Sequence, residues 1–168
     1  MDRAALRSVQ EPLKARYRED PGAARVTLSA AGTLGEGITC SVRAGRALAA
    51  AGLHPASGGD GSTLCSGDLL LEALVACAGV TLGAVATSLE IEIAHGQVHA
   101  EGDLDFRGTL GVDRDVPVGF ESIRLRFELE TDATDEQLDT LLRLTERYCV
   151  VYQSLASQPS LAGSWNRL

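Results

Sequence analysis

The amino-acid sequence predicts an α+β domain, and three patterns support this class. An almost uncharged run, Leu69 to Leu82, has the length and composition of a buried helix. The segment Glu121 to Thr131 alternates apolar and charged residues, as a strand with one face in water does. Thr134 and Gln137 have the spacing of a capping box that begins a second helix. The predicted order of strands, long helix, strands and helix is typical of α+β domains and differs from the regular alternation of a doubly wound sheet.

The length of 168 residues and the hydrophobic content of 45% are sufficient for one domain with a substantial core. Residues 1–22 are rich in charge and end at Pro21-Gly22, so we expect an N-terminal appendage there and a single domain over residues 23–168. The first strand is expected at Arg25 to Ser29 and its hairpin partner at Ile38 to Arg43. The intervening glycines, Gly32, Gly35 and Gly37, are expected to serve the turn.

The charge balance limits the classes of partner. A net charge of −8 disfavours binding to the phosphate backbone of nucleic acids. The first seven residues are charged and lack the apolar core of a signal peptide, and no uncharged stretch reaches the roughly 20 apolar residues that span a bilayer. We therefore expect a cytoplasmic protein that binds neither nucleic acid nor membrane, in which any disulfide is transient and catalytic.

The central helix is expected over residues 66–89, with Ser66 as its N-cap. Because it is apolar nearly all round, we expect it to be buried on most sides. In the second helix, Leu138, Leu142 and Cys149 are expected on one face, since spacings of four and seven residues are close to whole turns. A further strand is expected over residues 97–109, and the tail after Cys149 is expected to add a short strand.

Cysteine is the most informative residue type in this chain. Cys77 lies within the apolar helical run and Cys149 ends the second helix, so two packed helices would each carry a cysteine, as a dithiol redox centre needs. The simpler interpretation is that a cysteine on an apolar helix is a small core residue. Cys40, on the inward face of a strand, is expected to be structural. Cys65 lies near a helix N-terminus, which lowers a thiol pKa, and is a minor candidate.

Two segments of the sequence carry recognisable motifs. The run from Ser66 to Cys77, SGDLLLEALVAC, is similar to the pattern P-x-E-L-L-x-A-A-L-x-A-C, which is that of the central helix in the OsmC/Ohr family. Thr145 to Val150 is similar to the second motif of the same family, in which a cysteine ends the second long helix. The resemblance covers about residues 25–155 in element order. It implies an OsmC-like fold with β-sheets wrapped around two long central helices in an intertwined homodimer, with each active site at the subunit interface.

The resemblance also implies a two-cysteine peroxidase that reduces organic hydroperoxides or hydrogen peroxide without a cofactor. By position, Cys77 would be the peroxidatic thiol and Cys149 the resolving thiol, and an external thiol or dithiol would reduce the resulting disulfide. An apolar pocket lined by residues such as Leu74, Val80 and Leu144 would suit a fatty or aromatic hydroperoxide.

Activation of Cys77 is the open question in this hypothesis. A mid-helix position gains little from the helix dipole, and burial raises a thiol pKa. In the family, an arginine from the N-terminal strand region, held by an acid near the start of the central helix, stabilises the thiolate. Asp68 is the candidate acid, but nine residues of helix rise about 13 Å, so it would have to act on a partner's site, unless it is simply a first-turn acid.

The hairpin turn contains no arginine, so Arg25 is the first candidate, with Arg43, Arg46, Arg107 and Arg147 as further options. This departure leaves two alternatives open: a non-catalytic module of the same fold that binds a small apolar ligand, or a redox sensor. The three histidines do not have metal-ligand spacing with the cysteines, so no metal is expected.

Overall fold

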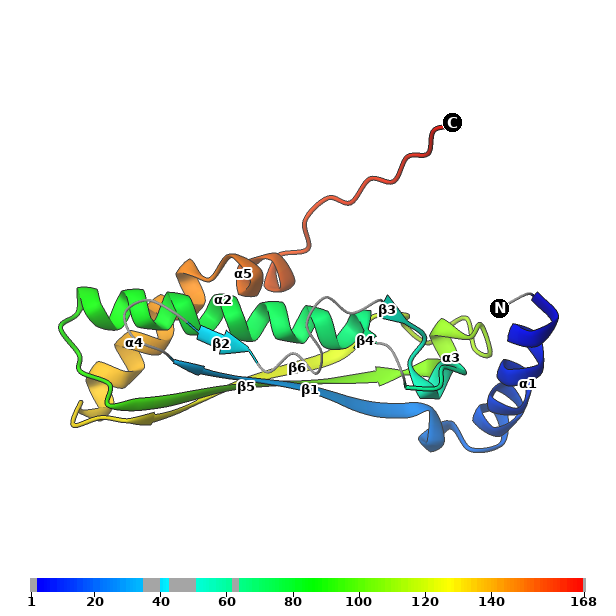
Figure 1. Ribbon diagram of the computed structural model, residues 1–168, viewed down its shortest axis with the longest axis horizontal. Helices are drawn as coiled ribbons and strands as arrows, with labels where there is room; N and C mark the ends of the chain where they lie inside the picture. The colour runs from blue at the N-terminus through cyan, green and yellow to red at the C-terminus, as the bar shows by residue number, and fades with distance from the viewer. Residues whose placement is uncertain (1–2, 35–39, 43–50, 62–63, 168) are drawn as a thin grey trace.

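The computed structural model describes residues 3–34, 40–42, 51–61 and 64–167. A four-stranded antiparallel sheet in the order β2-β1-β5-β6 carries helix α2 across one face, and a short parallel pair, β3-β4, lies beside it (Figure 1). The predicted α+β class is therefore confirmed. The strands are β1 (Arg25–Leu34), β2 (Cys40–Val42), β3 (Ala51–Gly52), β4 (Leu64–Cys65), β5 (His95–Asp105) and β6 (Phe120–Glu130).

The first hairpin forms as predicted, with Leu34 of β1 paired to Cys40 of β2. Strand β1 is longer than expected, and Gly32 belongs to it rather than to the turn, since it pairs with Val42. Gly35, Gly37, Ile38 and the side chain of Cys40 lie outside the part of the structure that is described.

Strand β6 has the two-faced character that its sequence predicts. Its apolar residues alternate with exposed charged ones, and Ile123, Leu125 and Phe127 pack against the core beneath α2. On the other face, Arg124 pairs with Asp103 of β5. Strand β5 ends at Asp105, where the single-turn helix α3 (Phe106–Thr109) begins, so the strand is shorter than the predicted 97–109. Asp105 stops it because its carboxylate accepts a hydrogen bond from the Arg107 N–H.

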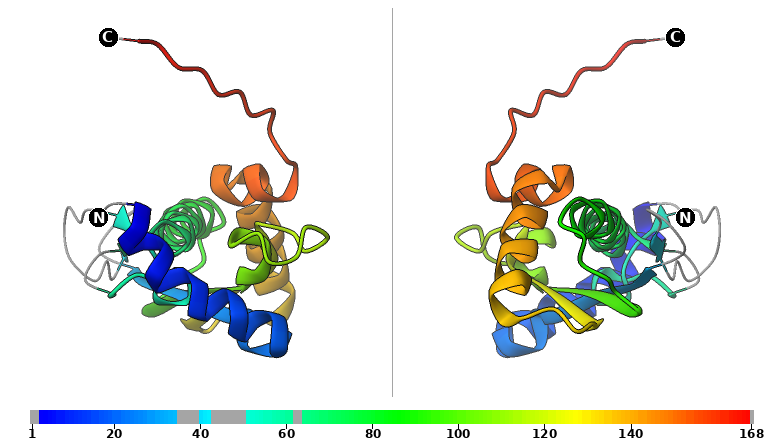
Figure 2. Two further views of the ribbon diagram at one scale, coloured as in Figure 1. Left: turned by 90° about the vertical axis from the view of Figure 1, so that its right-hand side faces the viewer. Right: turned by 90° about the vertical axis from the view of Figure 1, so that its left-hand side faces the viewer.

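Helix α2 (Ser66–Ser88) has nearly the predicted bounds, but its N-cap is Cys65 rather than Ser66. It buries one face rather than most of its surface; the fully buried residues are Leu71, Leu74, Val75, Ala78 and Leu82. By length and composition alone α2 could cross a bilayer, although its buried face packs on the sheet and on α4, as a core helix does (Figure 2). The face turned away from the sheet leaves Leu69 and Val80 exposed by 37% and 39%.

Helix α4 (Asp135–Tyr148) begins at the predicted capping box: Gln137 N–H donates to the Thr134 hydroxyl, and the Gln137 side chain accepts from Thr134 N–H. The three residues expected on one face do not share one environment: Cys149 is buried and Leu138 packs against a core cluster, whereas Leu142 is 40% exposed. The buried positions of the helix itself are Leu141 and Thr145. Packing of α4 against α2 buries Leu141 and Thr145 in place of Leu142, a choice that the apolar pattern of the sequence did not decide.

The chain breaks helical geometry at Cys149, whose extended backbone (φ −72°, ψ 110°) ends α4 and caps a further helix, α5 (Val150–Ala156). The prediction of a short strand after Cys149 was therefore wrong, since a helix forms there instead. Residues 157–167 have no regular structure and extend away from the body (Figure 1).

The N-terminal segment forms helix α1 (Arg3–Glu19) and a short 3-10 turn, η1 (Pro21–Ala24), at one end of the sheet (Figure 1). Tyr17 near the end of α1 is 2% exposed and packs with Ala24, Phe106 and Leu110. Its hydroxyl donates to the carbonyl of Ala56, 2.6 Å away, in a second short turn, η2 (Pro55–Ser57). The C-terminal turn of α1 is thus attached to the rest of the molecule.

Candidate functional site

Cys77 and Cys149 meet where α2 is crossed by the junction of α4 and α5. Cys149 is fully buried in the core cluster, and Cys77, half-buried, packs against the same cluster. The two thiols lie close enough that each shifts the pKa of the other. Both are free thiols in this structure. The fold therefore brings together two cysteines that are 72 residues apart in the chain.

The break between α4 and α5 aims the Cys149 side chain. Because Cys149 is the N-cap of α5, its sulfur accepts a hydrogen bond from the Tyr152 N–H at 3.4 Å. Its own N–H still donates to the Thr145 carbonyl at 2.9 Å, which completes the last turn of α4. The residue is thus held from both sides, with Cys77 packed against the same core cluster.

The surroundings of Cys77 favour its thiolate. Burial raises the pKa of this thiol, but four donors together outweigh burial and hold the pKa below its ordinary value: the N–H groups of Val151 and Val150, the Cys149 thiol and the Thr81 hydroxyl. Hydrogen bonds to the charged form of an acid stabilise that form. Neutral hydrogen-bond donors therefore lower the Cys77 pKa by more than burial raises it.

Cys149 has the opposite character. Burial raises its pKa, the Tyr152 N–H partly opposes this, and the hydrogen bond to Cys77 together with the repulsion from that group's charge raises it further, to about 11. The two thiols therefore differ in acidity: the pKa of Cys77 lies below its ordinary value and the pKa of Cys149 lies above it.

The sequence did not reveal these donors. The Val150 and Val151 amides reach Cys77 only because the helix breaks at Cys149, and the residues that directly follow, Val150 to Ser157, include neither the proline nor the glycine that usually marks a break. Thr81 did leave a signal, since it follows Cys77 by four residues, the spacing at which helical side chains meet.

The other two predicted site residues, Asp68 and Arg25, lie elsewhere in the chain. Asp68 is half-buried in the first turn of the unbroken helix α2, where burial raises its pKa and the charge of His54 opposes the rise. Arg25 begins β1. The pKa of Asp105 is lowered mainly by Arg107, and the positive charge of Arg25 makes a smaller contribution in the same direction. Within the described part of the chain, neither residue is among the groups that shift the Cys77 pKa.

The remaining arginine candidates have other partners or lie outside the described structure. The Arg107 guanidinium forms a bidentate ion pair with the buried Asp105, its closest contact being 2.6 Å. Arg147 stacks over the ring of Tyr148 at 5.6 Å. Arg43 and Arg46 fall outside the described residues.

Two pockets lie beside the helices that carry the cysteine pair, although neither cysteine is among their described lining residues. The three residues predicted to line one pocket are shared between the two: Val80 and Leu144 line the first and Leu74 lines the second. The first, which we call the Thr81 pocket, has a volume of about 560 Å³ and lies between α2 and α4. It is lined by Val80, Thr81, Ala84, Val85, Ser88, Leu89, Leu144 and Tyr148. The second has a volume of about 650 Å³ and lies between β6 and α5, with Leu74, Phe120, Glu146 and Tyr152 among its lining residues.

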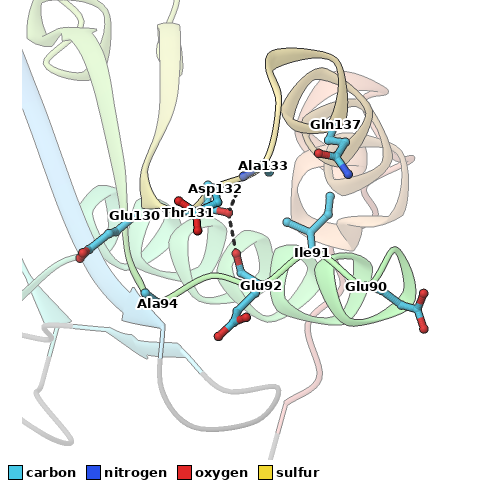
Figure 3. Close-up of a pocket in the computed structure, with 9 residues that line it drawn as sticks. All are labelled: Glu90, Ile91, Glu92, Ala94, Glu130, Thr131, Asp132, Ala133 and Gln137. Carbon is cyan, nitrogen blue, oxygen red and sulfur yellow. Dashed lines mark hydrogen bonds between the residues drawn. The ribbon is translucent and has the colours of Figure 1, made fainter.

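A third pocket, of about 460 Å³, lies at the end of the molecule where α2 leads into β5 and β6 leads into α4 (Figure 3). Its rim carries Glu90, Glu92, Glu130 and Asp132, and the Thr131 hydroxyl donates to the Glu92 carbonyl at 2.5 Å. The cysteines are not part of it. Among the described residues, no group of three His, Cys, Asp or Glu side chains is arranged to hold a metal ion.

Comparison with known proteins gave a family and a fold. A family model described as OsmC-like protein matches residues 59–162, which is more than half of the chain. The crystal structure of an OsmC-like hydroperoxide resistance protein from Jannaschia sp. CCS1 superposes with a TM-score of 0.61 at 16% identity, covering 82% of this chain and 91% of that one. The search of curated protein sequences gave no significant match.

Proposed function

This chain belongs to the OsmC-like protein family, and we propose on that premise that it reduces hydroperoxides with a pair of cysteine thiols. The observation that carries the proposal is the contact between Cys77 and Cys149, in which one thiol has a lowered pKa and the other a raised one. A peroxidase of this kind needs one thiolate that attacks the peroxide and a second thiol that then forms a disulfide with the oxidised sulfur.

In the first step, the Cys77 thiolate attacks the terminal oxygen of the hydroperoxide, the one that carries the hydrogen. A sulfur–oxygen bond forms, the oxygen–oxygen bond breaks, and the alkoxide that leaves takes up a proton to become an alcohol. Sulfur is oxidised to a sulfenic acid and the peroxide is reduced. The donors around Cys77 increase the fraction of thiolate at neutral pH, which is the reactive form.

In the second step, Cys149 attacks the sulfenic sulfur. The Cys149 proton and the sulfenic hydroxyl leave as water, and a disulfide joins the two residues. The thiols are already in contact, so the step needs no large movement of the helices. An external thiol or dithiol then reduces the disulfide by exchange. We place the protein in the cytoplasm, where such thiols are kept reduced.

The Thr81 pocket supports an organic hydroperoxide as the substrate. It shares Thr81 with the donors around Cys77, and no described residue that lines it carries a charge at neutral pH. Its only polar side chains are hydroxyls, those of Thr81, Ser88 and Tyr148. An apolar tail would gain from burial there, whereas a charged substrate would lose its hydration without compensation.

We extend the proposal to a homodimer that pairs two copies of α2. On the face of α2 opposite its buried one, residues follow the spacing of four and three that is typical of helix–helix seams: Leu69, Ala73, Ala76, Val80, Gly83 and Thr87. Three of these six residues, Ala73, Ala76 and Gly83, are small, which permits close approach of two backbones. Leu69 and Val80 are both more than one-third exposed in a single chain.

Within this dimer, we propose that Asp68 and Arg25 act on the site of the partner chain. Asp68 lies about 13 Å along the helix from Cys77 of its own chain, a distance that excludes direct contact. Replacing Asp68 with Asn or Arg25 with Gln is expected to lower the peroxidase rate. Unchanged rates in both variants would remove these two residues from the mechanism.

The central experiment is mass spectrometry after one equivalent of cumene hydroperoxide. We expect a disulfide between Cys77 and Cys149 in the unmodified protein and, in Cys149→Ser, a sulfenic acid on Cys77 that dimedone traps. Cys77→Ser should no longer consume peroxide. Cys65→Ser is the matched control, since Cys65 is also partly exposed but caps the start of α2, and it should behave like the unmodified protein.

Equal peroxide consumption by the unmodified protein and by Cys77→Ser would refute the reductase. A Cys77 pKa above the ordinary value of about 8.5 would instead favour the non-catalytic ligand-binding module. The dimer is tested separately by light scattering: Val80→Glu should give monomers, whereas Val118→Glu, a control at a 64% exposed position outside α2, should not. A monomeric unmodified protein would refute the seam.

A further inference from the structure

We infer that Thr81 is a catalytic residue of this site: its hydroxyl donates to the Cys77 sulfur and accepts from the hydroperoxide, holding the two reactants together. The inference rests on the proposed reductase and adds to it a residue outside the cysteine pair. Thr81 stands one helical turn after Cys77 on α2 and also lines the Thr81 pocket. It is therefore the residue that the nucleophile and the proposed substrate pocket share.

The behaviour of a second threonine on the same helix shows that this contact is not a general property of α2. Thr87 donates its hydroxyl to the carbonyl of Gly83, four residues earlier, at 2.8 Å. That bond is the usual one for a threonine within a helix. Thr81 has the same local choice, but its hydroxyl is one of the groups that lower the pKa of the Cys77 thiol, one helical turn away.

The geometry of a hydroxyl fits a double role. It has one proton to donate and two lone pairs that accept. When the proton is directed at the Cys77 thiolate, a lone pair remains for the O–H of a hydroperoxide in the pocket. The oxygen that carries this hydrogen is the one that Cys77 attacks, so the bond would place the reacting oxygen beside the sulfur.

Thr81 makes no covalent bond in this scheme. The sulfur–oxygen bond forms and the oxygen–oxygen bond breaks as in the proposed first step, while the threonine hydroxyl keeps its proton throughout. Its effect is on the fraction of thiolate and on the orientation of the substrate, and these two effects can be measured separately.

The test compares Thr81→Val, which removes the hydroxyl at nearly equal volume, with Thr81→Ser, which keeps it and is the matched control. The pKa of Cys77 is measured from the pH dependence of its alkylation by iodoacetamide, followed on the Cys77 peptide by mass spectrometry. Thr81→Val should raise this pKa by about one unit, which is about a tenfold loss of thiolate at neutral pH. Thr81→Ser should leave it unchanged.

The second measurement is kcat/KM for cumene hydroperoxide as a function of pH. Loss of orientation predicts that Thr81→Val stays at least about tenfold slower even at a pH where Cys77 is fully ionised, and that Thr81→Ser recovers the rate. An unchanged Cys77 pKa in Thr81→Val would overturn the hydrogen bond, and a full recovery of rate at high pH would overturn the orienting role. If the unmodified protein consumed no peroxide, the reductase would fail, while the alkylation measurement would still decide whether Thr81 serves the thiolate.

Discussion

Replacing Leu141 with Ala is expected to destabilise the protein by about 3 kcal/mol, whereas the same change at Leu142 should cost about 1 kcal/mol. Leu141 is 1% exposed and packs with Leu82, Ala86 and Ile91, so its truncation loses the full transfer energy of the side chain and leaves a cavity between α2 and α4. Leu142 is 40% exposed, so part of that energy is never gained and solvent can fill the space.

The comparison matters for function because the buried face of α4 determines where Cys149 points. A rotation of α4 by one residue, about 100°, would bury Leu142 and carry Cys149 away from Cys77. The assay is urea denaturation followed by circular dichroism. The free energies of unfolding of the two variants are compared provided that both have the same dependence of free energy on urea concentration (the m-value). An equal or greater loss for Leu142→Ala would refute the orientation of α4 described above.

Three further outcomes are expected. Thr145→Val should stabilise the protein by about 1 kcal/mol in thermal denaturation, because the Thr145 hydroxyl is fully buried with no hydrogen-bond partner among the described residues; a loss of stability would show that the hydroxyl has a use. Thr134→Ala should cost about 1 kcal/mol through loss of the capping box, and a circular dichroism melt equal to that of the unmodified protein would contradict the cap. With rising pH, alkylation of Cys77 should reach its plateau below the range of an ordinary thiol, since its pKa is lowered, while Cys149 should become reactive only near pH 11; a reversed order, read by peptide mass spectrometry, would mean that the roles of the two thiols are exchanged.

The elements that could be predicted are those whose signals lie within a few residues of one another. The capping box at Thr134 and the alternation in β6 are local, and both appear where they were expected. The central helix was predicted to within one residue at each end, because its apolar run is long and uninterrupted. The choice of Cys77 and Cys149 as a pair also came from the sequence, through the resemblance to a family.

The α+β class, the central helix and the two cysteines were thus determined by the sequence itself, since periodicity and caps act over one or two turns of chain. Only the tertiary structure decided what surrounds Cys77. Two of its donors are the backbone amides of Val150 and Val151, which the helix break at Cys149 places beside it. The side chains of these two residues give no indication of that role. Backbone N–H groups are alike in every sequence, so their use depends on where the crossing of α2 with α4 and α5 places them.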